Sequence, residues 1–143
     1  MQRICTSLAE KGGYRVVLVG RQLAESKPLD AALPFEQRRL RCWARRGKLF
    51  YLEFNLRLLF FLLFRRMDAV CAVDLDTILP AWLAARLFGR KFIYDAHELF
   101  TQVPEVVERP RTQRMWQRIE RFAVPRTDAA YTVCESLKNY FEE

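Results

Sequence analysis

Short apolar runs alternate along the chain with longer segments whose apolar residues recur at helical spacing. A buried strand is predicted at residues 14–19, further strands at 68–73, 91–94 and 129–133, and a weak, more polar strand at 36–42. Helices are predicted at 4–11, 48–66, 76–88, 113–124 and 135–141. This alternation predicts an α/β fold, in which one domain over residues 1–143 forms a Rossmann-like parallel sheet flanked by helices.

The apolar positions of two predicted helices indicate the faces that they bury. In the helix that stops at Gly89, Asp76 or Thr77 is expected to cap the start. The residues expected to be buried there are Leu79, Trp82, Leu83 and Leu87. In the helix at 113–124 they are Trp116, Ile119, Phe122 and Ala123.

The segment 49–64 is apolar around most of its helical circumference but contains Glu53, Asn55 and Arg57. Its uninterrupted part, 58–64, is far shorter than the roughly 20 residues that a spanning helix needs. We therefore expect that it does not cross a bilayer. A core helix and a helix lying on a membrane surface both remain open.

The net charge of +7 suits an acidic partner. Basic residues gather in one run, which is either a contact for anionic lipid headgroups or a solvated face. Its members are Arg38, Arg39, Arg41, Arg45, Arg46 and Lys48. Nucleic acid is not expected as a partner, because the aromatic residues lie on helices with leucine and are not interleaved with Lys or Arg on strands.

The cysteine and histidine content argues against a metal site. The four cysteines form no CxxC pair and His97 is the only histidine, so we expect no metal and no cofactor. Cys5, Cys71 and Cys134 have apolar neighbours and are interpreted as reduced core thiols. With no apolar signal segment after Met1, the expected location is cytoplasmic, either free or peripheral at the inner face of the membrane.

Polar residues follow three of the predicted strands. They are Asp74 and Asp76 after the second apolar run, Asp95, His97 and Glu98 after the third, and Glu135 and Ser136 after the last. Ligands of open parallel sheets bind at the carboxyl ends of the strands. These three clusters are therefore the candidate ligand-binding residues.

The segment Tyr94-Asp95-Ala96-His97-Glu98-Leu99, directly after an apolar strand, resembles the YDAHEL segment of bacterial family-4 glycosyltransferases. Three further stretches resemble that family in the expected order: 3–8 with 13–21, 74–81, and 132–137. In the last of them Cys134 stands at the usual serine position of a VSESL motif. The resemblance covers nearly the whole chain.

The resemblance implies the N-terminal, acceptor-side domain of a two-domain GT-B glycosyltransferase, shortened at both ends. Met1 stands where the family has the aspartate of an Asp-x-Arg-Val segment, so the family's first strand is expected to be missing. The chain ends where the family enters its interdomain linker, so the donor-binding domain is expected to be absent. The isolated chain is then expected to be inactive.

The resemblance also implies a chemistry: retaining, metal-independent transfer from a nucleotide sugar to a glycan or lipid-linked acceptor, as in polysaccharide biosynthesis. By resemblance His97 is catalytic, beside the donor sugar and the acceptor. The implied substrate-binding residues are Asp95, Glu98, Glu135, Ser136 and Arg3.

Structural interpretations of the same residues stay open. His97 fixes its loop, Asp95 caps a turn and Glu98 binds a loop amide, or Glu135 and Ser136 only cap a helix.

Two other functions remain as alternatives. One is a non-catalytic, membrane-associated binding subunit of a split glycosyltransferase. The other is a different nucleotide-binding domain, which the absence of any GxGxxG or GxxxxGK[ST] string disfavours.

Overall fold

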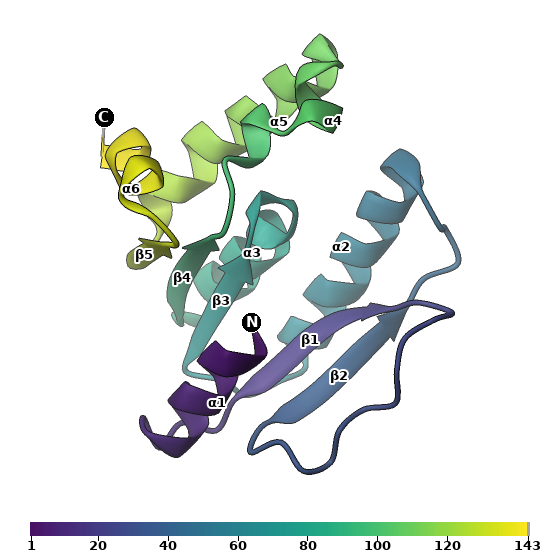
Figure 1. Ribbon diagram of the computed structural model, residues 1–143, viewed down its shortest axis with the longest axis vertical. Helices are drawn as coiled ribbons and strands as arrows, with labels where there is room; N and C mark the ends of the chain where they lie inside the picture. Colours follow the sequence, from purple (N-terminus) through teal and green to yellow (C-terminus); the bar gives the residue numbers. More distant parts are fainter. Residues whose placement is uncertain (143) are drawn as a thin grey trace. The chain divides into compact units, whose positions relative to one another are not determined.

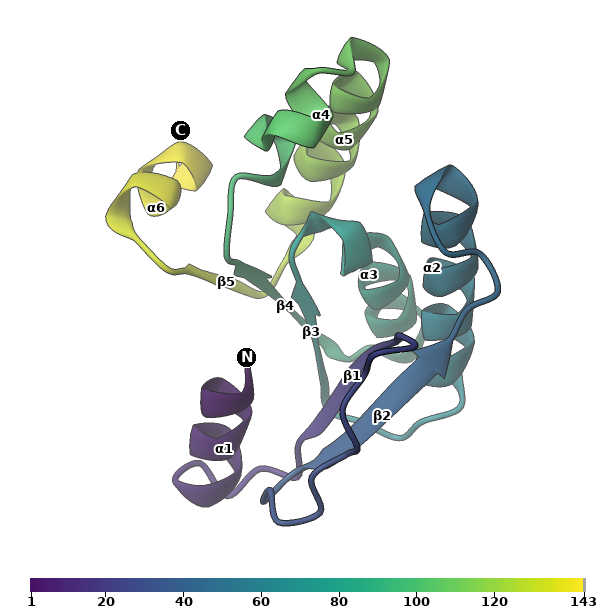
Figure 2. The same cartoon turned by 45° about the vertical axis from the view of Figure 1, so that its right-hand side comes forward.

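The structure is a computed structural model that describes residues 1–142, with the side chains of residues 1–141. The chain divides into two compact units, Met1–Phe54 and Asn55–Glu143, which are described separately (Figures 1 and 2). Both contain parallel strands accompanied by helices, so the predicted α/β class is confirmed.

The first unit is built around a pair of parallel strands. Its elements are α1 (Gln2–Glu10), β1 (Val17–Gln22), β2 (Glu36–Arg41) and the first part of α2 (Gly47–Leu63). The register pairs Val17 with Glu36 at one end and Gln22 with Arg41 at the other. The strand predicted to stop at Gly20 instead continues to Gln22, because Gly20 takes part in the ladder opposite Arg39.

The second unit contains a three-stranded parallel sheet in the order β3-β4-β5. Its strands are β3 (Ala69–Val73), β4 (Lys91–Ala96) and β5 (Ala129–Thr132). Its helices, besides the rest of α2, are η1 (Leu75–Thr77), α3 (Ile78–Phe88), η2 (Phe100–Gln102), α4 (Pro104–Val107), α5 (Pro110–Ala123), η3 (Val124–Arg126) and α6 (Glu135–Glu142). The central strand β4 is therefore held by a neighbour on each side, which fixes the backbone that leads to His97.

The buried face of α3 differs from the prediction. The helix buries Ile78, Pro80, Ala81, Ala84 and Ala85, whereas Leu79 and Leu87 are 39% and 60% exposed. The predicted burial of these two leucines is wrong. The helix presents its small residues to the interior and packs against β3 and β4, since small side chains allow the closest approach of the two backbones.

One residue marks each end of α3: Thr77 at its start and Gly89 at its end. Gly89 adopts the left-handed conformation (φ 61°) that ends the helix, as the sequence predicted. Thr77 occupies the N-cap position, but its hydroxyl donates a hydrogen bond to the Val73 carbonyl at 2.8 Å. Thr77, one of the two predicted capping residues, is thus the N-cap residue, but it makes no side-chain capping hydrogen bond to α3.

The cysteines differ in exposure. None of the four forms a disulfide; Cys5 is buried, whereas Cys71 and Cys134 are exposed. The interpretation of Cys71 and Cys134 as core thiols is therefore wrong. Cys71 lies on β3 between buried Val70 and Ala72, and successive strand residues face opposite sides of the sheet.

None of the helices within residues 1–142 combines the length and the apolar character required to cross a bilayer.

Candidate functional site

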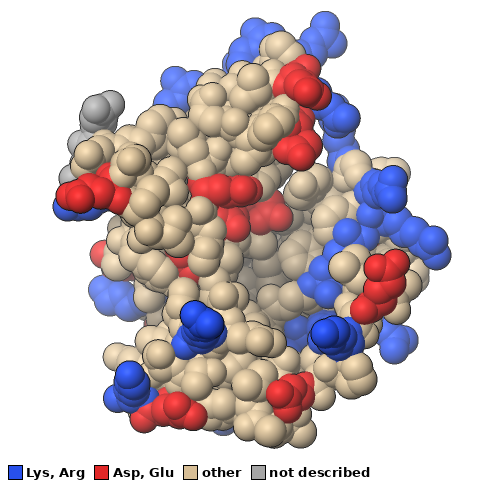
Figure 3. All heavy atoms as spheres, in the orientation of Figure 1, with Lys and Arg blue, Asp and Glu red and all other residues tan. Residues whose placement is uncertain are grey.

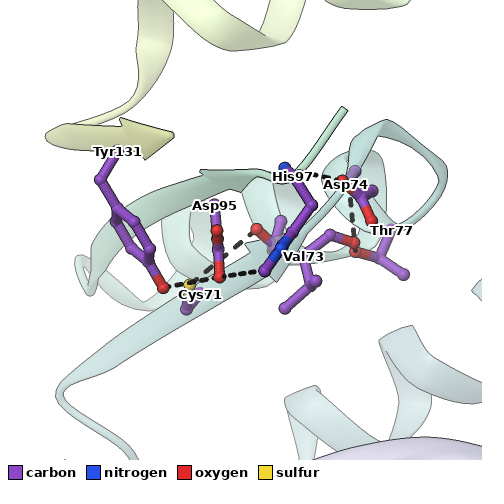
Figure 4. Close-up of polar contacts among 8 residues, drawn as sticks. Cys71, Val73, Asp74, Thr77, Asp95, His97 and Tyr131 are labelled. Atoms are coloured by element: carbon purple, nitrogen blue, oxygen red, sulfur yellow. Dashed lines mark hydrogen bonds and ion pairs between the residues drawn. The ribbon is translucent and has the colours of Figure 1, made fainter. Parts of the chain in front are cut away.

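The candidate site lies in the second unit, where β3, β4 and β5 end (Figure 4). Asp95 is near the end of β4, and its side chain is fully buried. Tyr131 of β5 is its register partner, and the Tyr131 hydroxyl donates a 2.7 Å hydrogen bond to Asp95 Oδ2. The parallel register of β4 and β5 thus brings a phenol from one strand to a carboxylate on the other.

His97 shares the same carboxylate oxygen. Its Nε2 lies 3.1 Å from Asp95 Oδ2, and its side chain keeps 32% exposure. Residues two apart in an extended segment project to the same side, which places the imidazole beside the Asp95 carboxylate. Asp95 therefore accepts from Tyr131 on one side and contacts His97 on the other, while its Oδ1 is buried without a hydrogen-bond partner among the described residues.

Hydrogen bonds join the backbone around His97 to Asp74, the residue that follows β3. The His97 N–H donates to Asp74 Oδ1 at 3.0 Å, and the Asp74 N–H donates to the Asp95 carbonyl at 2.9 Å. Asp74 has φ 58° and ψ 170°, a region that is almost restricted to glycine. Strained backbone of this kind costs about 1–3 kcal/mol and clusters at functional sites, because the surrounding contacts must hold it in place.

Two carboxyl groups at this edge have raised pKa values. Burial raises the pKa of Asp74. Burial, with the nearby Asp74 carboxylate as the second cause, raises the pKa of Asp76 to about 6. Burial and the hydrogen bond to Asp95 raise the pKa of the Tyr131 phenol, which therefore stays a hydrogen-bond donor at neutral pH. Several acidic side chains therefore lie at this edge of the sheet, and the negative charge of Asp74 disfavours ionisation of Asp76.

The geometry predicts the tautomer of the only histidine. An ionised Asp95 carboxylate can only accept hydrogen bonds, so the proton of neutral His97 is expected on Nε2, which leaves the lone pair on Nδ1. Long-range ¹H–¹⁵N NMR spectra should show one imidazole signal set, of the Nε2–H form. In Asp95→Asn we expect a mixture of both tautomers, and an Nδ1–H form in the wild-type chain would contradict the arrangement.

The other predicted site residues lie in different places. Glu98 follows His97 and is exposed, as are Glu135 and Ser136 at the start of α6. Glu135 lines an open hollow of about 480 Å³ at the end of β5, together with Tyr131, Thr132 and Cys134. Arg3 is exposed on α1, in the first unit, which is described separately. The second unit thus brings Asp95 and His97 into contact, and Tyr131 links them to the hollow beside Glu135.

Sequence reasoning missed Tyr131, which was included only as part of a predicted strand. Asp74 was noted among the polar residues after a strand, but its contact with the His97 amide was not expected. The signal for Tyr131 is the pairing of β4 with β5, which places a phenol opposite a strand aspartate. Such a pairing depends on contacts between distant segments and is not readable from either segment alone.

Among the described residues, no group of three or more His, Cys, Asp or Glu side chains is arranged to hold a metal ion.

Comparison with known proteins gives one result that covers the whole chain. A family model described as a glycosyl transferase 4-like domain matches residues 1–143. No match was found among the curated proteins or among the solved structures.

Proposed function

Because the chain belongs to the glycosyl transferase 4-like family, we propose that it supplies the acceptor side of a sugar transfer from a nucleotide sugar to a glycan or lipid-linked acceptor. One observation supports this function above the others. A single, partly exposed histidine lies at the carboxyl end of the central strand β4 and contacts a fully buried carboxylate. That edge of a parallel sheet is where ligands bind.

In this proposal His97 is the catalytic residue, and Asp95 acts through it. Asp95 is too deeply buried to touch an acceptor, so it fixes the orientation and tautomer of the imidazole. His97 Nδ1 then accepts a hydrogen bond from a sugar hydroxyl, which orients the acceptor for transfer. Glu98, Glu135 and Ser136 are exposed at the same end of the second unit's strands and complete the acceptor contacts with their oxygens.

In this proposal, a separate donor-binding domain binds the nucleotide of the sugar donor. The sequence contains no glycine-rich phosphate loop of the GxGxxG or GxxxxGK[ST] type. Catalysis requires donor and acceptor to be held in one geometry, since orientation contributes much of the rate.

We expect the purified 143-residue chain to show no sugar transfer and no hydrolysis of nucleotide sugars. The measurement is release of the nucleoside phosphate from a panel of nucleotide sugars, with the His97→Ala chain as the background control. Turnover clearly above that control would contradict the need for a separate donor-binding domain. A gain of turnover on adding such a domain would support the proposal.

A second candidate function is a non-catalytic binding subunit that faces a membrane. The observation that favours it is the exposure of large apolar side chains along α2, at helical spacing. These are Leu49, Leu52, Leu56 and Phe60, which are 73%, 59%, 47% and 59% exposed. If a donor-binding domain restores transfer and His97→Ala abolishes it, the catalytic function holds. Transfer that is restored equally with His97→Ala would favour the non-catalytic subunit.

A further inference from the structure

Glu120 is a buried acidic residue to which the proposed transfer assigns no role. Acidic side chains are exposed at several places on the face of the molecule that Figure 3 shows. Glu120, by contrast, belongs to the buried face of α5 and is only 7% exposed. Burying a carboxylate is costly unless hydrogen bonds replace its contacts with water. The groups that touch Glu120 therefore decide what this residue does.

Two donors from different segments meet at the Glu120 carboxylate. The Tyr140 hydroxyl donates to Oε1 at 3.0 Å, and the Thr101 hydroxyl donates to Oε2 at 3.4 Å. Thr101 belongs to η2 and is fully buried, whereas Tyr140 belongs to α6. Burial raises the pKa of Glu120, and the hydrogen bonds from Tyr140 and Thr101 act against that rise. Each carboxylate oxygen thus has a donor, and each donor comes from a different segment.

Further contacts hold η2 against α5. Gln113 Nε2 donates to the Thr101 carbonyl at 3.0 Å. The Phe100 ring packs edge-on against Trp116, with 5.0 Å between the ring centres. Thr101 is therefore held through its main chain as well as its hydroxyl, and the position of its segment depends on α5.

The last turn of α6 is attached in a similar way. Burial and then the hydrogen bond to Glu120 raise the pKa of the Tyr140 phenol, which therefore stays a donor at neutral pH. The neighbouring Phe141 ring packs edge-on against Tyr94 of β4, with 6.0 Å between the ring centres. Helix α6 is thus joined to α5 through Glu120 and to the sheet through Phe141.

Both segments that meet at Glu120 carry residues of the proposed acceptor site. Glu98 precedes Thr101 by three residues, in the loop that begins at His97. Ser136 precedes Tyr140 by four residues, which is about one turn along α6. One buried carboxylate therefore links two parts of the acceptor site that are far apart in the sequence.

We propose that Glu120 is a positioning residue, which couples the loop after His97 to α6 and so fixes the two parts of the acceptor site relative to each other. The coupling follows from the burial of the carboxylate. When one donor is lost, a buried oxygen is left without a hydrogen bond, and the carboxylate shifts toward water or takes up a proton. Either change loosens its contact with the other donor. The proposal rests on the proposed function in that the residues it positions are those of the acceptor site.

Amide hydrogen exchange of the 143-residue chain, followed by NMR, tests the coupling without any sugar. One reporter is the Gln102 N–H, which donates to the Leu99 carbonyl in the loop. The other is the Lys138 N–H, which donates to the Cys134 carbonyl in α6. Each reporter is observed while the donor on the opposite segment is removed.

The expected effects are reciprocal. Tyr140→Phe, on α6, should speed the exchange of Gln102 in the loop by about fivefold, the size expected for the loss of one hydrogen bond. Thr101→Val, in η2, should speed the exchange of Lys138 on α6 by a similar factor. In a Glu120→Gln chain, which keeps the side-chain volume but lacks one acceptor oxygen, adding Tyr140→Phe should leave the Gln102 rate unchanged.

Thr127→Val is the matched control. It also removes a threonine hydroxyl that donates a hydrogen bond beside α5, here to the Val124 carbonyl at 2.8 Å. It should change the exchange of Gln102 and Lys138 by less than about twofold. The Asp128 N–H, which donates to the Phe92 carbonyl, reports on a general loss of stability and should keep its rate in every single variant.

Several outcomes would overturn the coupling. They are the absence of both cross effects, equal effects in Thr127→Val, an equal rise at Asp128, and a cross effect that persists in the Glu120→Gln chain. The two single variants and the control decide the matter even when Glu120→Gln fails to fold.

A kinetic measurement separates positioning from catalysis. In an enzyme assembled with a donor-binding domain, Glu120→Gln should raise KM for the glycan acceptor of the transfer assay about tenfold and leave kcat within about twofold. The reason is that His97 keeps its contacts with Asp95 and Asp74, which do not involve Glu120. A fall in kcat with an unchanged KM would contradict the positioning role.

The two proposals fail separately. Absence of the exchange coupling leaves the role of His97 in transfer untouched. Full transfer activity in His97→Ala contradicts the proposed function and leaves the exchange coupling through Glu120 untouched.

Discussion

Replacing His97 with alanine should lower kcat for sugar transfer by about 100-fold in an enzyme assembled from this chain and a donor-binding domain. A positioned acid–base or hydrogen-bonding side chain typically contributes a factor of about 10²–10⁴. The free energy of unfolding should fall by only about 1 kcal/mol, because Asp95 keeps its hydrogen bond from Tyr131 when the imidazole is removed.

Two matched variants separate catalysis from loop fixing. Tyr131→Phe keeps His97 but removes a donor from Asp95, so kcat should fall by about tenfold, while NMR spectra should still show the Nε2–H tautomer because the Asp95 carboxylate still accepts from His97. Arg86→Gln, at an exposed position on α3, should leave kcat unchanged. Near wild-type turnover in His97→Ala would remove this residue from the site. A loss of stability as large as the loss of activity would indicate a histidine that only fixes its loop.

Asp76→Asn is expected to stabilise the chain by about 1–2 kcal/mol at pH 7.5. The pKa of Asp76 is raised to about 6 in the folded chain, against an ordinary value of 3.8. A shift of this size corresponds to about 3 kcal/mol, and the estimate is halved because the side chain remains partly exposed.

The sign of this effect follows from proton binding. Between about pH 4 and 6 the folded chain holds a proton on Asp76 that the unfolded chain has released, so stability falls as pH rises through this range. Asparagine carries no titrating proton, and its advantage should vanish near pH 3.5. Urea midpoints at both pH values measure the difference, with Asp68→Asn at an exposed position as the control. An equal gain at both pH values would show that the charge of Asp76 is not the cause.

The strands of the second unit were predictable because strands of parallel sheets are nearly continuous apolar runs, a pattern that β5 keeps although it is largely exposed. Residues 68–73, 91–94 and 129–133 were each placed within two residues of the observed strand ends. The rule that ligands bind at the carboxyl ends of such strands then directed attention to Asp95 and His97. Local sequence was sufficient for both steps.

Contacts between distant segments were not predictable in this way. The partner of Asp95 depends on the register of β4 against β5, which brings Tyr131 opposite it. The buried face of α3 was predicted from side-chain hydrophobicity. Because α3 packs closely on the sheet, the buried positions are taken by the small residues Ala81, Ala84 and Ala85, and Leu79 is exposed. The strain at Asp74 likewise has no signature in sequence, because it arises from how two strand ends are tied together.

The strand register of the second unit also has a kinetic consequence. Ala69 pairs with Lys91 across the short α3 crossover, whereas Ile93 pairs with Ala129 across η2, α4, α5 and η3. Closing the shorter loop costs less chain entropy, so the β3–α3–β4 segment is expected to form first during folding and β5 to join later. Pulse-labelled hydrogen exchange should then protect the amides of β4 that face β3 before those of β5. Until β5 docks, Asp95 has no phenol to bind, and the environment of His97 is completed only in the last folding step.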